Sequence, residues 1–157
     1  TSAGTSQPLA DTQRQKVEGA IQEYPQLKLL SCSLGCPANK INITAFARDD
    51  TFAGYAPSAH PGNIIFYPRA FRFGAQDFAG LLAHELGHNI DWLSGSIFDN
   101  FRDQVYCGKL GTYPWNEDKD ETFAEAVRLY MIGDPLIQSY CGGKAFTFFN
   151  ELFGQCR

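Results

Sequence analysis

The segment His84-Glu85-Leu86-Gly87-His88 constrains this chain more than any other part of its sequence. Two histidines that are four residues apart lie on the same face of an α-helix, so both imidazole rings can reach one metal ion. The pattern therefore predicts a helix here that keeps one face clear for a metal.

The residues around this segment also fit a helix, from Asp77 to about Leu93. On a helical wheel, His84, His88 and Asp91 lie nearly opposite an apolar stripe, which indicates that burial in the core does not explain the histidines. The stripe consists of Phe78, Leu82, Leu86, Ile90 and Leu93.

The residue types match the chemistry of zinc peptidases, for which the pattern HExxH is a signature. Neutral imidazoles bind the Zn²⁺ ion, and the glutamate beside the first histidine can take a proton from the metal-bound water. We therefore expect His84 and His88 to be metal ligands and Glu85 to be the catalytic base.

A catalytic zinc site usually has three protein ligands, so a third must lie elsewhere in the chain. Glu121 and Glu125 share one face of a helix that we expect to begin at Asp118 or Asp120 and to end near Met131. On a solvent-exposed helix face, two like charges at this spacing would repel each other. A bound metal ion would compensate this repulsion, which favours a metal site over a solvated face. Glu121 is the expected ligand, and Glu125 is expected to accept a hydrogen bond from the free ring N–H of a ligand histidine.

Three other residues have open roles. Asp91 is one turn beyond His88, which suits an orienting contact to a histidine better than metal ligation. His60 lies in a predicted loop and either faces solvent or touches substrate. Arg128, which follows Glu125 by three residues, either neutralises charge there or lies on the surface.

The pattern of elements predicts an α+β fold with a small mixed sheet before the metal helix and a mainly helical half after it. Strands are expected at 27–30, 41–46 and 63–67, and helices from Asp11 or Thr12 to about Tyr24, over 136–140 and over 144–153. By analogy with zinc peptidases, this is a zincin-like single domain over residues 8–157, in which an edge strand at Ile64–Phe66 lies over the HExxH helix. Residues 1–7 are expected to form a loose tail.

The composition excludes several classes of protein. A chain of 157 residues with 44% hydrophobic content suits one domain with a substantial core. The net charge of −4 without a basic run argues against nucleic-acid binding. No apolar run approaches the ~20 residues of a membrane span. We expect a monomer that acts on a peptide or protein.

The cysteines favour secretion. Five are many for a small intracellular enzyme, and Asn42-Ile43-Thr44 is a glycosylation acceptor pattern. The start at Thr1 lacks the parts of a signal peptide, which fits a mature form. We expect two disulfides and one free thiol; the pairing stays open, with Cys141 and Cys156 favoured.

The sequence from His84 to Asp91, followed by Glu121-Thr122-Phe123-Ala124-Glu125-Ala126, resembles the catalytic domain of anthrax lethal factor and the related Pro-Pro endopeptidases. The likeness covers roughly the C-terminal half. It implies one catalytic Zn²⁺ held by His84, His88 and Glu121, with Glu85 as the general base and Glu125 beside the ligands. It also implies a tyrosine that stabilises the oxyanion, for which Tyr113 is nearest in position and Tyr106 is the alternative.

Two rival hypotheses remain. Gly111-Thr112 is similar to the G-T-x-D element of the deuterolysin-like aspartate-zincins, although Pro114 replaces the aspartate; Asp118 or Asp91 would then bind the metal. The chain could instead be a non-catalytic binding module stabilised by zinc, with Cys107 as a fourth ligand. The sequence leaves the cleavage site open, although a groove rich in aromatic residues would favour apolar or proline-containing substrates; the candidates are Phe52, Tyr55, Phe66 and Tyr67.

Overall fold

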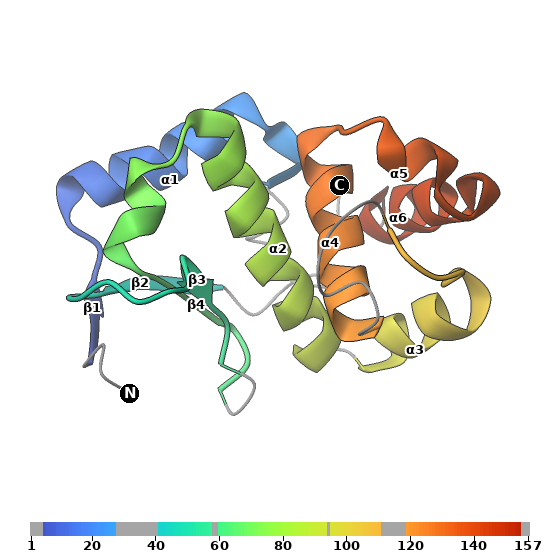
Figure 1. Cartoon of the computed structure of the whole chain (residues 1–157), viewed down its shortest axis with the longest axis horizontal. Coiled ribbons are helices and arrows are strands. Elements are labelled where there is room, and N and C mark those ends of the chain that lie inside the picture. The colour runs from blue at the N-terminus through green and yellow to red at the C-terminus, as the bar shows by residue number, and fades with distance from the viewer. Residues whose placement is uncertain (1–4, 28–40, 58–59, 94, 111–118, 155–157) are drawn as a thin grey trace.

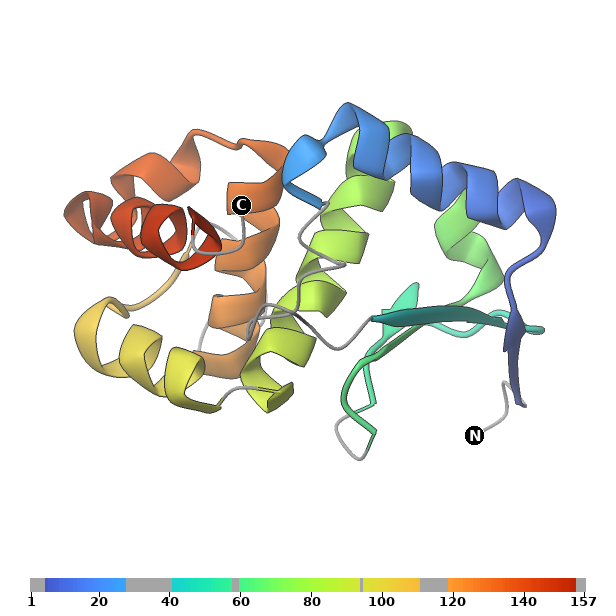
Figure 2. The same cartoon turned by 180° about the vertical axis from the view of Figure 1, so that it is seen from behind.

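A small sheet and the helices that cover one of its faces form the N-terminal half of the molecule (Figure 1; Figure 2). The computed structural model describes residues 5–27, 41–57, 60–93, 95–110 and 119–154. This half contains β1 (Ser6–Pro8), α1 (Asp11–Glu23), β2 (Asn42–Phe46), β3 (Gly54–Tyr55), β4 (Asn63–Phe66) and the 3-10 helix η2 (Pro68–Arg72).

The sheet is mixed, as expected, with the strand order β1-β2-β4-β3. Strand β2 runs parallel to β4, with Ile43 opposite Ile64, while the outer strands β1 and β3 are antiparallel to their neighbours. The strands predicted at 41–46 and 63–67 are confirmed as β2 and β4. Of the strand predicted at 27–30, Leu27 lies in a 3-10 turn after Pro25, and the rest is outside the described residues.

Two expectations about the edges of the sheet were wrong. Ile64–Phe66 is not an edge strand, because β4 lies between β2 and β3. The strand at this edge is β3, which we did not predict, because two residues are too few to show an alternating pattern. Ser6 and Gln7, which we expected in a loose tail, belong to β1 and pair with Phe46 and Ala45 of β2.

The two faces of the sheet have different neighbours. Ile64 and Phe66 point into the main core, which also contains Val17 of α1 and Phe78 of the following helix. The opposite face carries a separate small cluster of Phe46, Tyr67 and Ile65. The alternation of buried and outward side chains along β4 is that of a strand with one face on the core.

Helices form the rest of the chain (Figure 1). They are α2 (Ala75–Leu93), α3 (Gly95–Gln104), α4 (Lys119–Ile132), α5 (Leu136–Ser139), the 3-10 helix η3 (Tyr140–Gly143) and α6 (Lys144–Gly154). The helices predicted around the two motifs and at the C-terminal end are confirmed, whereas α3 was not predicted. Phenylalanines hold these helices together, since Phe101 of α3, Phe123 of α4 and Phe149 of α6 are fully buried and contact one another.

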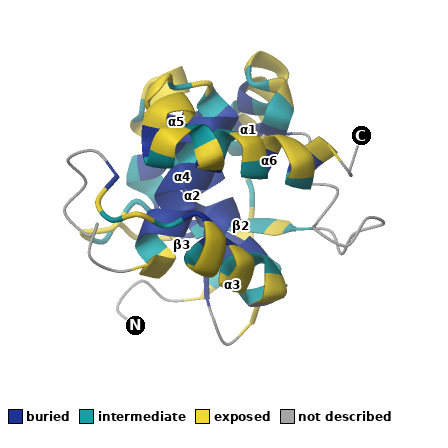
Figure 3. Cartoon of the chain, turned by 90° about the vertical axis from the view of Figure 1, so that its right-hand side faces the viewer, coloured by how far each residue is buried: buried dark blue, intermediate teal, exposed yellow. Residues whose placement is uncertain are grey.

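Helices α2 and α4 lie against each other in the centre of the molecule, where most of their residues are buried (Figure 3). Gly87 makes this approach possible, because a Cβ atom at that position would lie only 2.7 Å from the Cα atom of Ala124. Real Cβ atoms essentially never approach a backbone atom this closely. The glycine in the HExxH segment therefore determines how near the second motif can come to the first.

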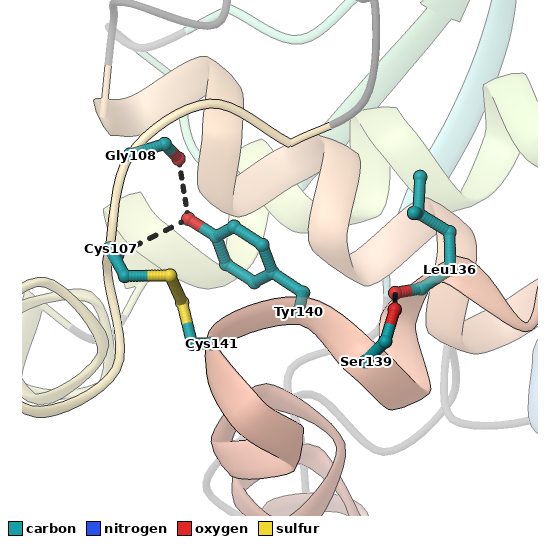
Figure 4. Close-up of a disulfide and its surroundings, with 6 residues drawn as sticks. All are labelled: Cys107, Gly108, Leu136, Ser139, Tyr140 and Cys141. Carbon is teal, nitrogen blue, oxygen red and sulfur yellow. Dashed lines mark hydrogen bonds between the residues drawn. A yellow bond between two sulfur atoms is a disulfide. The ribbon is translucent and has the colours of Figure 1, made fainter.

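A disulfide between Cys107 and Cys141 ties the segment after α3 to η3 (Figure 4). The hydroxyl group of Tyr140 donates a hydrogen bond of 2.6 Å to the carbonyl oxygen of Gly108 beside this bridge. The favoured pairing of Cys141 with Cys156 was wrong, because Cys141 is bonded to Cys107. Cys32, Cys36 and Cys156 lie outside the described residues, so the expected free thiol stays a prediction.

Among the described residues, no helix is long and apolar enough to cross a membrane.

Candidate metal centre

The three predicted metal ligands converge where α2 lies against the first turn of α4. The Nε2 atom of His84 lies 3.2 Å from one carboxylate oxygen of Glu121, and the Nε2 atom of His88 lies 3.1 Å from the other. The candidate ligand atoms of the three residues all lie within 4.8 Å of one another. This group could hold a metal ion.

Local structure explains the convergence. His84 and His88 are one turn apart on α2, with their ring centroids 4.9 Å from each other. Glu121 is in the first turn of α4, and the close contact at Gly87 brings that turn to the histidines. Both histidines are buried, while the side chain of Glu121 retains 28% of its exposure, so the centre opens to solvent on the glutamate side.

The electrostatics of the group suit a cation. Burial lowers the pKa of His84, but the carboxylates of Glu121 and Glu125 outweigh burial and raise that pKa to about 9. Burial raises the pKa of Glu121, and its contacts with the two histidines outweigh this and hold the pKa far below its usual range. Glu121 is therefore a carboxylate, and a metal ion would compete with a proton for His84.

Glu85 lies beside the ligands and is buried, with an exposed fraction of only 6%. Burial raises its pKa, which the positive charge of His84 and His88 partly opposes. Its carboxyl group faces strand β3, since a Cβ atom on Gly54 would lie 3.3 Å from Oε1 of Glu85. The expected base thus lies between the candidate metal ligands and an edge of the sheet.

Glu125 lies between His84 and Arg128, and the side chain of Arg128 is 32% exposed. One of the carboxylate oxygens of Glu125, Oε2, lies 3.4 Å from Nδ1 of His84, close enough for an ion pair but without a hydrogen bond. The other accepts hydrogen bonds from Nε and Nη2 of Arg128, with the first at 2.8 Å. Arg128 crosses α2 at Gly80, where a side chain would come within 3.3 Å of the guanidinium group. Of its two open roles, the structure supports charge neutralisation.

His88 has different surroundings from His84. Its Nδ1 atom is buried and has no hydrogen-bond partner in the described part of the chain. Its ring instead stacks on Trp92, with the centroids 5.4 Å apart and the planes 13° from parallel. Asp91, which we expected to orient a histidine, is hydrogen-bonded to Asp120, and burial together with that second carboxyl group raises the pKa of Asp91 to about 6.

The sequence analysis missed Asn89, a fully buried residue on α2. Its side chain accepts a hydrogen bond of 2.6 Å from the backbone N–H of Gly62 and donates one of 3.0 Å to the carbonyl oxygen of Asn63. It also donates to the carbonyl oxygen of Glu85, one turn earlier in the helix. A polar residue on the buried face of an amphipathic helix is the signal that could have identified it. Asn89 fixes the start of β4 against α2.

The remaining candidates lie elsewhere or outside the described residues. His60 is exposed in the loop before β4, and its carbonyl oxygen accepts a hydrogen bond from Asn63. Tyr106 packs partly against the core, with the ammonium group of Lys119 5.3 Å from its ring centroid. Tyr113 and Asp118 fall outside the described residues. Cys107 is in the disulfide, so in this state it has no thiolate to offer a metal.

Comparison with known proteins gives no relative: no family model, no curated protein and no solved structure matches this chain.

Proposed function

We propose that this chain is a secreted zinc-dependent endopeptidase with a zincin-like arrangement, similar to the lethal factor class. The observation that carries the proposal is the convergence of His84, His88 and Glu121 beside the buried Glu85. These side chains have the types and the order along the chain that peptide hydrolysis by a zinc peptidase requires.

The donor set supports zinc as the ion. Two imidazole nitrogens and one carboxylate are a common ligand set of catalytic zinc sites, which leave a further position open for water or substrate. When bound, Zn²⁺ supplies Lewis-acid chemistry, because it polarises a carbonyl group and lowers the pKa of water. The two histidines and Glu121 would hold it, and Glu125 with Arg128 would fix the orientation of His84.

Glu85 is the general base in this proposal. A carboxylate whose pKa is raised by burial is a better proton acceptor near neutral pH than an exposed one. It takes the proton of the attacking water at its carboxylate and later gives that proton to the departing amine. A tyrosine, Tyr113 or Tyr106, is expected to donate a hydrogen bond to the oxyanion.

The position of β3 supports an extended peptide as substrate. Its backbone passes next to Glu85 at Gly54, and it forms an edge of the described sheet, where a further strand can pair. Phe52 and Tyr55 are 65% and 46% exposed on either side of Gly54. The ring of Tyr55 stacks 6.5 Å from that of Phe46, on the face of the sheet away from α2, so a preference for apolar or proline-containing substrates stays a prediction from the sequence.

Secretion rests on the cysteine chemistry. The described structure contains a disulfide, and such bonds persist mainly in oxidising compartments. The bridge is compatible with an extracellular protein, and the glycosylation pattern at Asn42 supports the same conclusion.

Zinc content and cleavage of a peptide library, measured together, test the proposal. The wild type is expected to bind one zinc ion and to cut peptides, Glu85→Gln to keep the zinc and lose most activity, and Glu121→Ala to lose both. A Glu85→Gln variant that remains fully active would refute the role of Glu85. A wild type that binds zinc but cuts nothing would favour the binding module.

A further inference from the structure

We propose that Trp92 is the positioning residue for His88, holding the imidazole ring by stacking where His84 is held by a carboxylate. This inference rests on the proposed metal site, because the orientation of His88 matters most when its Nε2 atom ligates an ion. It gives the two ligand histidines different means of support.

A metal-binding histidine usually donates its second ring N–H to a carboxylate, a carbonyl oxygen or water, and this contact fixes the ring. For His84 the nearest such group is Glu125, whose carboxylate lies 3.4 Å from Nδ1 in an ion-pair contact without a hydrogen bond. The corresponding Nδ1 atom of His88 is buried without a hydrogen-bond partner in the residues that the structure describes. Another interaction must therefore restrict rotation of the His88 ring.

Stacking on Trp92 supplies that restriction. The two residues are one turn apart on α2, so their side chains meet on the same face, with ring centroids 5.4 Å apart and planes 13° from parallel. The face of an indole ring carries negative electrostatic potential and attracts a positively charged partner. An imidazole that ligates a divalent cation is more positive than a free one, so the contact becomes stronger when metal is bound.

Asp91, the other candidate to orient His88, has a different partner. It follows His88 by three residues, and its carboxyl group is hydrogen-bonded to Asp120, whereas His88 acts on it through charge and not through a hydrogen bond. Trp92 is also only partly buried, so packing in the core is not its main role. Within α2 the ring of His88 contacts the other ligand histidine, His84, edge-on at 4.9 Å and stacks in parallel on Trp92, which is not itself a candidate ligand.

The test compares Trp92→Phe, Trp92→Leu and Trp92→Ala with the wild type by zinc competition against a chromophoric chelator. Loss of the aromatic face should weaken zinc binding about five- to thirtyfold in the Leu and Ala variants, the range expected for a partly desolvated cation–π contact. The Phe variant should bind within about threefold of the wild type, because it keeps an aromatic face. The visible spectrum of the Co²⁺-substituted protein should change in the Leu variant and not in the Phe variant.

The outcomes separate this inference from the proposed function. If the wild type binds no zinc or cobalt, the metal site itself is wrong and the inference falls with it. If the wild type binds zinc and the Leu variant binds it equally well, the metal site stands and the role of Trp92 is refuted. Thermal unfolding of the chelator-treated proteins checks folding, and if the Ala variant does not fold, the comparison of Leu with Phe decides.

Discussion

Replacing Gly87 with alanine should damage both the core and the metal centre. Alanine is favoured over glycine inside a helix by up to about 1 kcal/mol. However, the new Cβ atom would lie 2.7 Å from the Cα atom of Ala124, whereas carbon atoms prefer separations of about 3.5–4.0 Å. Helices α2 and α4 must then move apart by roughly 1 Å, and overpacking of this kind costs about 1–3 kcal/mol.

The expected net loss for Gly87→Ala is about 1–2 kcal/mol in the free energy of unfolding, or a decrease of roughly 3–6 °C in Tm for a chain of this size. The same separation moves Glu121, one turn before Ala124, away from both histidines, so zinc affinity should fall at least about tenfold. Denaturation followed by circular dichroism measures the first effect, and competition with a chelator measures the second.

Gly19→Ala is a matched control, because Gly19 is within α1 and a Cβ atom there would meet nothing within 4 Å. This variant should be more stable than the wild type by about 0.5–1 kcal/mol and should bind zinc unchanged. If Gly87→Ala showed the same gain in stability and kept its zinc affinity, the close approach at Gly87 would not be what forms the site.

Three further perturbations have defined outcomes. Asn89→Ala leaves partly buried backbone groups of Gly62 and Asn63 without their partner, so urea denaturation should show a loss of about 1–3 kcal/mol. Replacing Cys107 and Cys141 by serine opens a bridge between residues that are 34 positions apart, for which the chain-entropy model gives a loss of about 3–4 kcal/mol in the same assay. In chelator-treated protein, the raised pKa of His84 contributes stability that is complete below its unfolded pKa of about 6.5 and is lost as the pH rises through about 9. Thermal unfolding at several pH values should therefore show Tm falling over that window, and a Tm that rises there would contradict the ion pairing of His84 with Glu121.

The sequence was most informative where structure is determined by residues close together in the chain. The spacing of His84 and His88, and that of Glu121 and Glu125, places each pair on one helical face, and these helices are present as predicted. The stacking of Trp92 on His88 is equally local and could have been predicted from the same four-residue spacing. We did not predict this stacking, because an aromatic residue at such a helix position is more often part of the core.

The missed features depend on contacts between distant segments. Strand β3 exists only because it pairs with β4, and no two-residue strand has a pattern of its own. The pairing of Cys107 with Cys141 depends on how η3 meets the end of α3, which cysteine spacing does not encode. The role of Gly87 becomes visible only when α4 lies against it. The identity of the ion and the hydrolysis of peptides stay predictions.

The contact between α2 and α4 has a consequence for how the protein opens. Because the candidate ligands lie on the two helices that meet in the centre of the core, the ligand set stays complete only while those helices are docked. Exchange of their buried amide hydrogens should then require an opening that also separates the candidate ligands. A ligand that binds only the native state slows such exchange by the factor 1 + [L]/Kd, so added zinc should protect the amides of both helices together. If zinc protected only the amides around His84 and His88, the segment of α2 that carries them would open independently of α4.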